Sequence, residues 1–220
     1  MSILDELGIK YGTDKSSLSH NYCNKYDKVL PFNRNETLTV MEIGVQGGGS
    51  IKMWEEYFYK SNIIGIDILP ECKKLETDRI KIEIGSQYDG DFLNEIGNKY
   101  GMFDMILDDG SHMNKHMIFS FEKLFPYIKS GGIYIIEDVC TSYWDYYDGG
   151  LLRYGSVIEY FKRLVDDVNF RGLINYDYME NSNARREDLL TPYSEKVQPD
   201  CITNIESINF LNGIIIITKK

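Results

Sequence analysis

Carboxylates gather at two places in the sequence, each directly after a short apolar segment. The first segment ends at Leu107 and is followed by Asp-Asp-Gly-Ser-His over residues 108–112; the second ends at Ile136 and is followed by Glu137 and Asp138. Neighbouring parallel strands lie about 4.8 Å apart, so acids at their carboxyl ends converge. Converging carboxylates raise each other's pKa unless a cation relieves the repulsion. Oxygen ligands without cysteine favour Mg²⁺, or Mn²⁺, over zinc.

Other interpretations of these residues stay open. Asp109 or Asp138 alone could cap the helix that follows it. His112 and His116 have the i, i+4 spacing of some zinc sites, although no third nitrogen or sulfur ligand is evident. The acids could also serve structure in an enzyme that needs no metal.

A glycine-rich segment lies earlier in the chain, between an expected strand and an expected helix. Residues 42–50 read Glu-Ile-Gly-Val-Gln-Gly-Gly-Gly-Ser. Glycines such as Gly44 and Gly47 let the backbone approach a flat ligand, and Asp67, at the end of the next apolar segment, could bind ribose hydroxyls. A dinucleotide oxidoreductase is a rival interpretation, but the second glycine of G-x-G-x-x-G is missing. A tight turn with a surface acid would also explain the pattern.

The elements that position these residues alternate between short apolar segments and helical ones. A parallel sheet with helices on both faces is the fold that such alternation favours. The expected strands are 38–44, 62–67, 80–84, 103–107 and 133–136. The expected helices are 50–60 with Ser50 as a possible N-cap, 89–100, 113–128 ending near Gly131-Gly132, and 156–168.

The end of the chain differs from this pattern. Residues 207–210 and 214–218 flank Asn212-Gly213, which is typical of a β-hairpin turn. We therefore predict an α/β fold with a doubly wound, mostly parallel seven-stranded sheet and an antiparallel C-terminal hairpin. Residues 1–220 are expected to form one domain, with 1–37 as an N-terminal lid segment and 140–200 as an insertion that shapes the acceptor pocket.

Composition limits the partners and the compartment. The chain has 220 residues, 43% of them hydrophobic, and a formal net charge of −10. An acidic chain disfavours nucleic acid and anionic lipid as partners. The aliphatic run 214–217 is too short to insert into a membrane. Four scattered cysteines and an acidic start without a signal peptide favour reduced thiols and a cytoplasmic protein.

Several motifs together resemble a known family. They are Asp108–His112, Ile136–Val139, Ser142-Tyr143-Trp144 followed by Gly149-Gly150, Lys10–Lys15 and His20–Tyr22. This set resembles the metal-dependent sugar O-methyltransferases of natural-product pathways, which are class I enzymes that use S-adenosylmethionine (SAM). Glu42 and the glycines after it look like motif I of class I methyltransferases.

The resemblance implies two cofactors, SAM and Mg²⁺ (or Mn²⁺), and roles for named residues. Asp109, Glu137 and Asp138 would hold the metal, which lowers the pKa of an acceptor hydroxyl. His112 would be the general base, since imidazole accepts protons near neutral pH, and Asp109 would share in catalysis. The residues expected at SAM are Tyr11, Thr13, Lys15, Glu42, Gly44, Gly47, Ser50, Asp67, Ser86, Gln87 and Asp108.

The acceptor is expected to be a small molecule, either a sugar or a phosphorylated or nucleotide-linked sugar. Candidate contacts are Tyr143 and Trp144, whose rings suit sugar faces, together with His20 and Arg153. The same aromatics could instead pack into the core, and residues 11–22 could be an ordinary helix and turn rather than a lid. A SAM-binding module without catalysis is the rival outside enzymes, and a homo-oligomer is possible.

Overall fold

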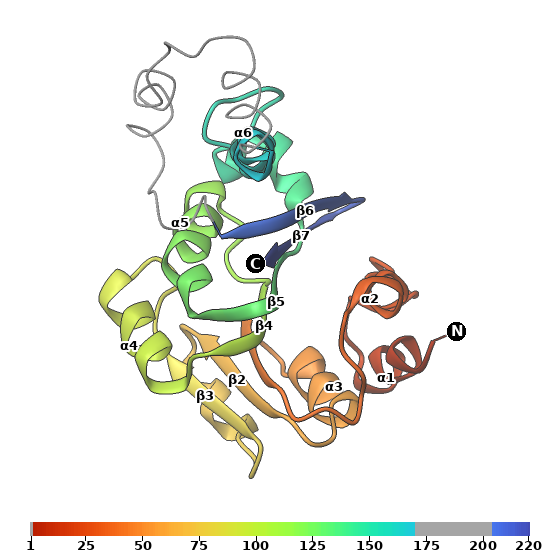
Figure 1. The fold of residues 1–220 in the computed structure, drawn as a ribbon. Helices are drawn as coiled ribbons and strands as arrows, with labels where there is room; N and C mark the ends of the chain where they lie inside the picture. Colours follow the sequence, from red (N-terminus) through yellow and green to blue (C-terminus); the bar gives the residue numbers. More distant parts are fainter. Residues whose placement is uncertain (1, 170–203) are drawn as a thin grey trace, which may run out of the picture.

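The computed structural model describes residues 2–169 and 204–220, and its seven strands form one sheet (Figure 1). The strand order is β3-β2-β1-β4-β5-β7-β6; the first five strands pair in parallel, and β7 runs antiparallel to both β5 and β6. The strands are β1 Thr39–Ile43, β2 Asn62–Asp67, β3 Ile80–Ile84, β4 Phe103–Asp108, β5 Ile128–Ile136, β6 Ile205–Leu211 and β7 Ile214–Lys219. The predicted doubly wound sheet with a terminal hairpin is confirmed.

Helices cover both faces of this sheet (Figure 1). One layer contains α1 Ile3–Tyr11, α2 Cys23–Val29 and α3 Gly49–Tyr57; the other contains α4 Gly90–Tyr100, α5 Asn114–Leu124 and α6 Val157–Val168. Short 3-10 helices lie at η1 Pro70–Leu75, η2 Phe125–Tyr127, η3 Val139–Tyr143 and η4 Asp145–Tyr147.

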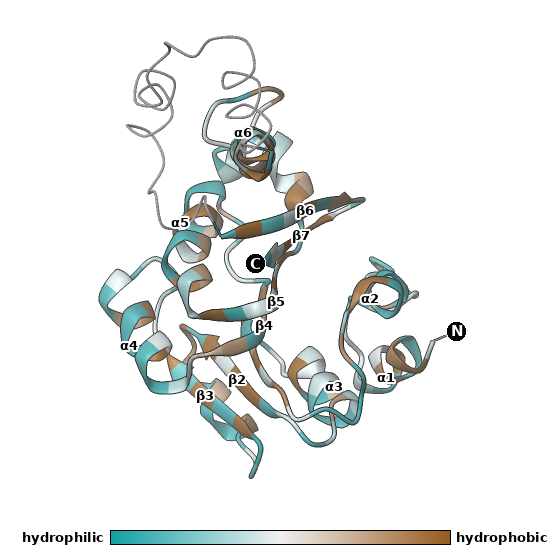
Figure 2. Cartoon of the chain, in the orientation of Figure 1, coloured by the Kyte–Doolittle hydropathy of each residue, from teal (hydrophilic) through white to brown (hydrophobic). Residues whose placement is uncertain are grey.

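The core has two halves because successive strand residues point to opposite faces. Val40 and Ile135 pack against the α1–α3 layer, whereas Met41 and Tyr134 pack against the α4–α6 layer. Both halves are apolar, and Figure 2 shows brown, hydrophobic stretches along the strands of the sheet. The packed sheet gives the residues at its carboxyl edge a rigid base.

Strand register brings the candidate site together. Ile43 pairs with Asp108, and Asp108 pairs with Ile136, so β1, β4 and β5 end at the same level. The expectation that the fourth and fifth strands are neighbours is therefore confirmed, and the loops that follow the three strands begin side by side.

Two predicted helix boundaries were wrong. The helix after the glycines begins at Gly49 with Gly48 as its N-cap, and Ser50 instead donates a hydrogen bond to Glu42. The helix expected to reach Ile128 ends at Leu124 and gives way to the 3-10 helix η2, because Pro126 has no N–H and restricts the residue before it. Gly131 and Gly132 lie inside β5 rather than at a helix end.

The two segments outside the sheet pattern differ in how much is described. The N-terminal segment contains α1, which packs beside α3, and α2. The insertion is described as far as residue 169; its polar part at 181–187, with Arg185 and Arg186, lies outside the described residues. Among residues 2–169 and 204–220, no helix is long and apolar enough to cross a membrane.

Candidate active site

A cavity of about 740 Å³ opens at the carboxyl edge of the sheet. It is bounded by the loops after β1, β2, β3, β4 and β5 and by the N-terminal segment. Nine of the eleven residues expected at SAM line it: Tyr11, Thr13, Lys15, Gly44, Gly47, Ser50, Asp67, Ser86 and Gln87. Asp109, His112 and Asp138 line the same cavity, so the cofactor and metal candidates share one space.

Two glycines in the loop after β1, Gly44 and Gly47, differ in what an added side chain would contact. Gly44 has φ +90°, and a Cβ there would lie 2.1 Å from the carbonyl oxygen of Asp109. A glycine is therefore required so that the loops after β1 and β4 can approach each other. A Cβ at Gly47 would meet open space, with no atom of the described residues within 4 Å.

Asp67 stabilises the glycine loop through hydrogen bonds to its backbone. Its Oδ2 accepts hydrogen bonds from the backbone N–H groups of Val45 and Gln46, both at 2.8 Å, and its Oδ1 accepts one from Leu69 at 2.9 Å. The carboxylate lines the cavity with much of its hydrogen-bonding capacity already used. A role toward a ligand would therefore be combined with fixing the loop shape.

Asp108 and Glu42 lie behind the cavity wall, although the sequence placed both at the cofactor. Asp108 is buried and accepts hydrogen bonds from Gln87 at 3.0 Å, from Tyr134 at 3.1 Å and from Ser120. Burial raises the pKa of Asp108 to about 6. Asp108 therefore orients Gln87, which does line the cavity.

Glu42 is also fully buried, at the end of β1. Its Oε1 accepts a hydrogen bond from Ser50 at 2.6 Å, while its Oε2 has no hydrogen-bond partner among the described residues. Burial raises the pKa of Glu42 to about 7, against the opposing effect of the nearby Lys15 ammonium. The buried Glu42 carboxyl group is therefore more readily protonated than an ordinary glutamate.

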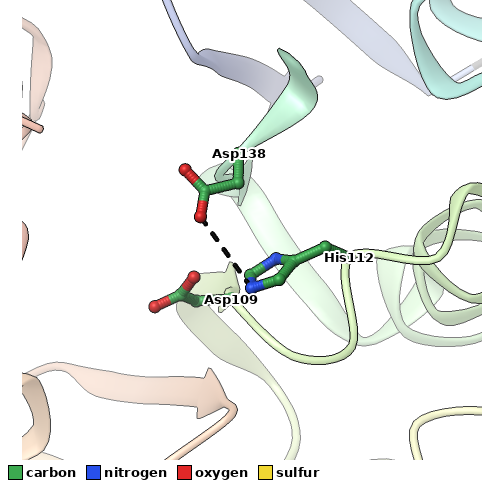
Figure 3. A group of neighbouring side chains, drawn as sticks. All are labelled: Asp109, His112 and Asp138. Atoms are coloured by element: carbon green, nitrogen blue, oxygen red, sulfur yellow. Dashed lines mark ion pairs between the residues drawn. The ribbon is translucent and has the colours of Figure 1, made fainter. Parts of the chain in front are cut away.

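Three side chains converge in the geometry of a cation site (Figure 3). Asp109, His112 and Asp138 each offer one ligand atom, and these atoms lie within 4.8 Å of one another. His112 Nε2 is 3.8 Å from Asp138 Oδ2. Both His112 and Asp138 have positive φ, at 56° and 52°, which is uncommon outside glycine and aims the two side chains at one point. Carboxylate oxygens suit Mg²⁺ or Mn²⁺, so Asp109 and Asp138 are the candidate ligands of this group, with the His112 imidazole beside them.

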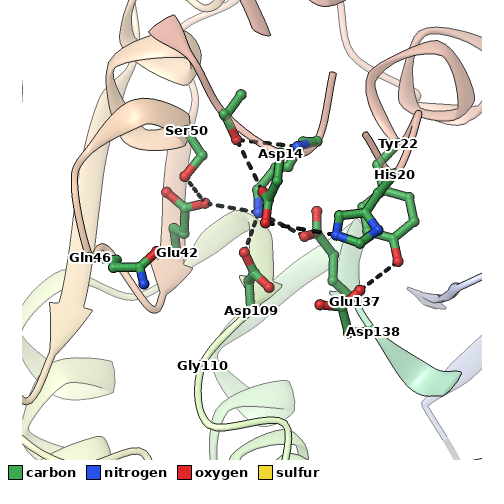
Figure 4. A network of polar contacts seen from close by, with 12 residues as sticks. Asp14, His20, Tyr22, Glu42, Gln46, Ser50, Asp109, Gly110, Glu137 and Asp138 are labelled. Atoms are coloured by element: carbon green, nitrogen blue, oxygen red, sulfur yellow. Dashed lines mark hydrogen bonds and ion pairs between the residues drawn. The ribbon is translucent and has the colours of Figure 1, made fainter. Parts of the chain in front are cut away.

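Glu137, which the resemblance also implies as a metal ligand, lies next to this group, and its role toward a metal stays a prediction. Its carboxylate is buried and accepts hydrogen bonds from Lys15 Nζ at 2.7 Å and from the hydroxyl of Tyr26. Burial raises the pKa of Glu137, while the Lys15 ammonium opposes that rise. Glu137 thus faces the N-terminal segment, next to Asp138 (Figure 4).

Lys15 lines the cavity as expected, but its ammonium is also the centre of a buried acidic cluster. Its Nζ contacts Asp109, lies 2.7 Å from Glu137 and 3.9 Å from Glu42, and the side chain is 1% exposed. Burial lowers the pKa of Lys15, but the surrounding carboxylates outweigh burial and raise it well above its ordinary value. The ammonium therefore stays charged and neutralises part of the converging acid.

Sequence reasoning missed this counter-charge, and it missed the tyrosines beside it. The hydroxyl of Tyr22 donates to Asp138 Oδ1 at 2.6 Å, and Tyr26 donates to Glu137. One signal was available: several acids at one edge require donors as well as a metal. Nothing in the local sequence says that residues 15–26 supply them.

The candidate acceptor residues lie outside the cavity wall. Tyr143 and Trp144 are about half exposed, at 50% and 53%, which excludes the alternative that they pack into the core. A row of rings connects Trp144 to the site, since Tyr147 lies 5.9 Å from Trp144 and 6.4 Å from His112 between ring centres.

His20, Arg153 and His116 have other partners. His20 stacks on Tyr22 with ring centres 5.3 Å apart, and Arg153 contacts Asp145 and the carbonyl oxygen of Gly149. His116 pairs with Ser111 rather than with His112, so the i, i+4 histidine pair does not form a zinc site among the described residues.

Searches by sequence find methyltransferases, although no family model matches the chain. The mycinamicin VI 2''-O-methyltransferase of Micromonospora griseorubida is 40% identical over 153 residues, which cover 66% of this chain and 38% of that protein. The L-olivosyl-oleandolide 3-O-methyltransferase of Streptomyces antibioticus is 35% identical over 192 residues, 80% of this chain and 49% of that protein. The chain therefore spans less than half the length of these relatives.

Searches by structure agree. The MycE methyltransferase of the mycinamycin pathway, in complex with Mg and SAH (S-adenosylhomocysteine), matches with a TM-score of 0.82 and 30% identity. The match covers 99% of this chain and 55% of MycE. The SAH-bound Podospora anserina methyltransferase PaMTH1, at 17% identity and a TM-score of 0.56, shares the fold.

Proposed function

Because this chain is a class I SAM-dependent methyltransferase related to the sugar O-methyltransferases, we propose that it transfers a methyl group from SAM to a hydroxyl of a sugar or similar small polar acceptor, with Mg²⁺ as the second cofactor. One observation carries this proposal. Asp109, His112 and Asp138 offer ligand atoms within 4.8 Å of one another in the wall of the cavity that the glycine loop and Asp67 also line.

The cavity suits SAM in its shape and polar groups. Ligands of doubly wound sheets bind outside the carboxyl ends of the strands, where this cavity lies. Gly47 leaves open space beside the loop after β1, and Asp67 lines the cavity at the end of β2. Ser86 and Gln87, which follow β3, line the part of the cavity where the adenine would lie.

The residues around the metal would act on the acceptor. A bound divalent cation supplies positive charge that lowers the pKa of a nearby hydroxyl. Asp109 and Asp138 would hold the cation, and His112, on the same loop as Asp109, would take the acceptor proton. Fixing the acceptor oxygen in line with the methyl group supplies much of the acceleration.

The acceptor, the lid and the oligomer belong to the same proposal. The acceptor would enter past Trp144 and Tyr147, whose rings lead toward His112. Sugars carried by mycinamicin and oleandolide are the acceptors named for the relatives. Residues 11–22 would close over both substrates as a lid and so exclude water. The chain would also associate with copies of itself as a homo-oligomer.

A metal-independent methyltransferase is the second candidate, and Lys15 favours it. The Lys15 ammonium already lies between Asp109 and Glu137, where a cation was expected. Methyl transfer measured after dialysis against EDTA separates the two candidates. We expect activity to be lost in EDTA and restored by Mg²⁺; full activity in EDTA would reject the metal-dependent mechanism.

A matched pair of variants tests the proposed metal residues. Asp138→Asn removes a ligand charge and should abolish Mg²⁺-dependent activity, while SAH binding, measured by calorimetry, stays within a few-fold of the wild type. Asp78→Asn makes the same change at an exposed residue before β3, at the opposite end of the sheet, and should alter neither. Loss of SAH binding in Asp138→Asn would show that the residue supports the cavity instead.

A further inference from the structure

The three carboxylates that follow β4 and β5 all receive donors from one stretch of the N-terminal segment, residues 15–26, which we call the docking segment. The pairs are Lys15 with Asp109 and Glu137, Tyr26 with Glu137, and Tyr22 with Asp138. These contacts join residues more than ninety positions apart in the sequence. The candidate cation site is therefore supported on one side by a separate piece of chain.

The contact of Tyr22 is arranged so that it leaves the candidate ligand atom free. Tyr22 donates to Oδ1 of Asp138 at 2.6 Å, whereas Oδ2 is the oxygen that faces His112 Nε2 at 3.8 Å. A hydrogen bond to one carboxylate oxygen fixes the direction of the other. Tyr22 thus orients Asp138 without taking the oxygen that points into the site (Figure 4).

Packing holds the Tyr22 ring in this position. The residue is 4% exposed, His20 stacks on the ring, and the Lys25 ammonium lies 4.6 Å from the ring centre. The β6–β7 turn fits closely against it, because a Cβ at Gly213 would lie 2.6 Å from the tyrosine hydroxyl. The hydroxyl has little freedom to point elsewhere.

Lys15 and Tyr26 fix the neighbouring acids in a similar way. Both are fully buried, and together they engage Glu137. A backbone hydrogen bond also links two parts of the docking segment, since the N–H of Cys23 donates to the carbonyl oxygen of Lys15 at 2.9 Å.

We propose that the docking segment is the outer shell of the candidate cation site and that Tyr22 is a positioning residue for Asp138. Tyr22 fixes one oxygen of Asp138 and leaves the other for the ion, so cation binding and the Tyr22 contact stabilise each other, and linkage makes this coupling reciprocal. The inference rests on the proposed function, since it takes Asp109 and Asp138 as ligands of the cation.

The first experiment measures Mn²⁺ affinity of the full chain by electron paramagnetic resonance of the free ion. Tyr22→Phe removes one oxygen and keeps the ring, and it should weaken Mn²⁺ binding by about 10- to 100-fold, the usual effect of losing an outer-shell partner. SAH affinity, measured in parallel, should stay within about twofold. Tyr59→Phe is the matched control, since Tyr59 is half exposed just before β2, at the opposite end of the sheet, and its variant should bind Mn²⁺ like the wild type.

The second experiment needs no variant. Hydrogen exchange of the wild type, with and without Mn²⁺, should show slower exchange of backbone amides in residues 15–26 when the ion is bound. The α4 helix, residues 90–100, serves as the internal reference and should not change. This measurement decides the matter if Tyr22→Phe fails to fold.

The outcomes separate this inference from the proposed function. If the wild type binds Mn²⁺ but Tyr22→Phe binds it equally well, or if exchange in residues 15–26 is unaffected by the ion, only the outer-shell role is overturned. If the wild type binds SAH but no Mn²⁺, the metal-dependent function fails and this inference fails with it. A tenfold or greater loss in Tyr22→Phe with intact SAH binding supports it.

Discussion

Replacing Lys15 by methionine removes the buried ammonium while keeping a side chain of similar length. The amine has three carboxylates within 4 Å, those of Asp109, Glu137 and Glu42, and the lysine is 1% exposed. Without the amine, the Glu137 carboxylate keeps one side-chain hydrogen bond among the described residues, the one from Tyr26. The variant therefore leaves buried negative charge without its counter-ion.

The size of the effect follows from this burial. Removing one partner of a buried ion pair lowers the free energy of unfolding by about 3–5 kcal/mol, because the remaining charge is uncompensated. Glu137 is as buried as Lys15, whereas Asp109 is 18% exposed and can regain water. We expect most of the loss to come from Glu137, so Lys15→Met should be destabilised by about 3 kcal/mol or more.

Urea unfolding in EDTA, followed by tryptophan fluorescence, measures this loss. Trp54 is fully buried and reports on unfolding, whereas Trp144 is about half exposed. The double variant Lys15→Met/Glu137→Gln removes the orphaned charge and should recover at least half of the lost stability. Lys28→Met makes the same change in charge at an exposed residue of α2 and should shift stability by less than about 0.5 kcal/mol. A loss below 1 kcal/mol in Lys15→Met, or a double variant no more stable than the single one, would refute the idea that Lys15 compensates Glu137.

Three further predictions concern single residues. His112→Ala should lower kcat by about 10²- to 10⁴-fold, the usual contribution of a general base, with SAH affinity unchanged; a normal kcat in steady-state assays would remove His112 from the proton transfer. Because burial raises the pKa of Glu42 from 4.5 to about 7, the folded state binds a proton that the unfolded state releases over that range, and this residue's contribution to stability falls as pH rises from about 4.5 to 7. This decrease in the free energy of unfolding is about 3 kcal/mol at most, and it should be absent in Glu42→Gln. If the stabilities of the two proteins change with pH in parallel, the assignment to Glu42 is contradicted. Gly44→Ala should destabilise the protein by at least about 2 kcal/mol in urea, since its Cβ would lie 2.1 Å from the Asp109 carbonyl oxygen at a left-handed φ, and an unchanged midpoint would contradict the need for glycine there.

The fold was predictable because each central strand is covered on both faces. Residues 62–67 and 80–84 form strands with the bounds that the sequence predicted, since a strand buried on both sides is a short apolar run between polar turns. The helix after β4 was predicted four residues too long, because its apolar pattern continues past Leu124 although Pro126 ends the helical hydrogen bonding. Pattern thus located the elements, and local stereochemistry set where they end.

The site was only half predictable, and the difference between Glu137 and Asp138 shows why. Side chains alternate along β5, so that Ile133 and Ile135 face the α1–α3 layer. Glu137 continues this alternation and reaches Tyr26 in the same layer, while Asp138, in the left-handed conformation, turns toward His112. The resemblance implies a metal role for both acids, which stays a prediction, whereas the alternation of the strand predicts that their side chains point differently.

Donors to these acids could not be predicted from local pattern, because they come from residues 94 to 122 positions away. The converging charge itself was a sufficient reason to look for them. Asp109, Glu137 and Asp138 share an edge with the buried Glu42, so several negative charges meet there. A buried carboxylate needs a partner of its own, and Lys15 supplies it. The N-terminal segment therefore meets a charge requirement that the sheet creates.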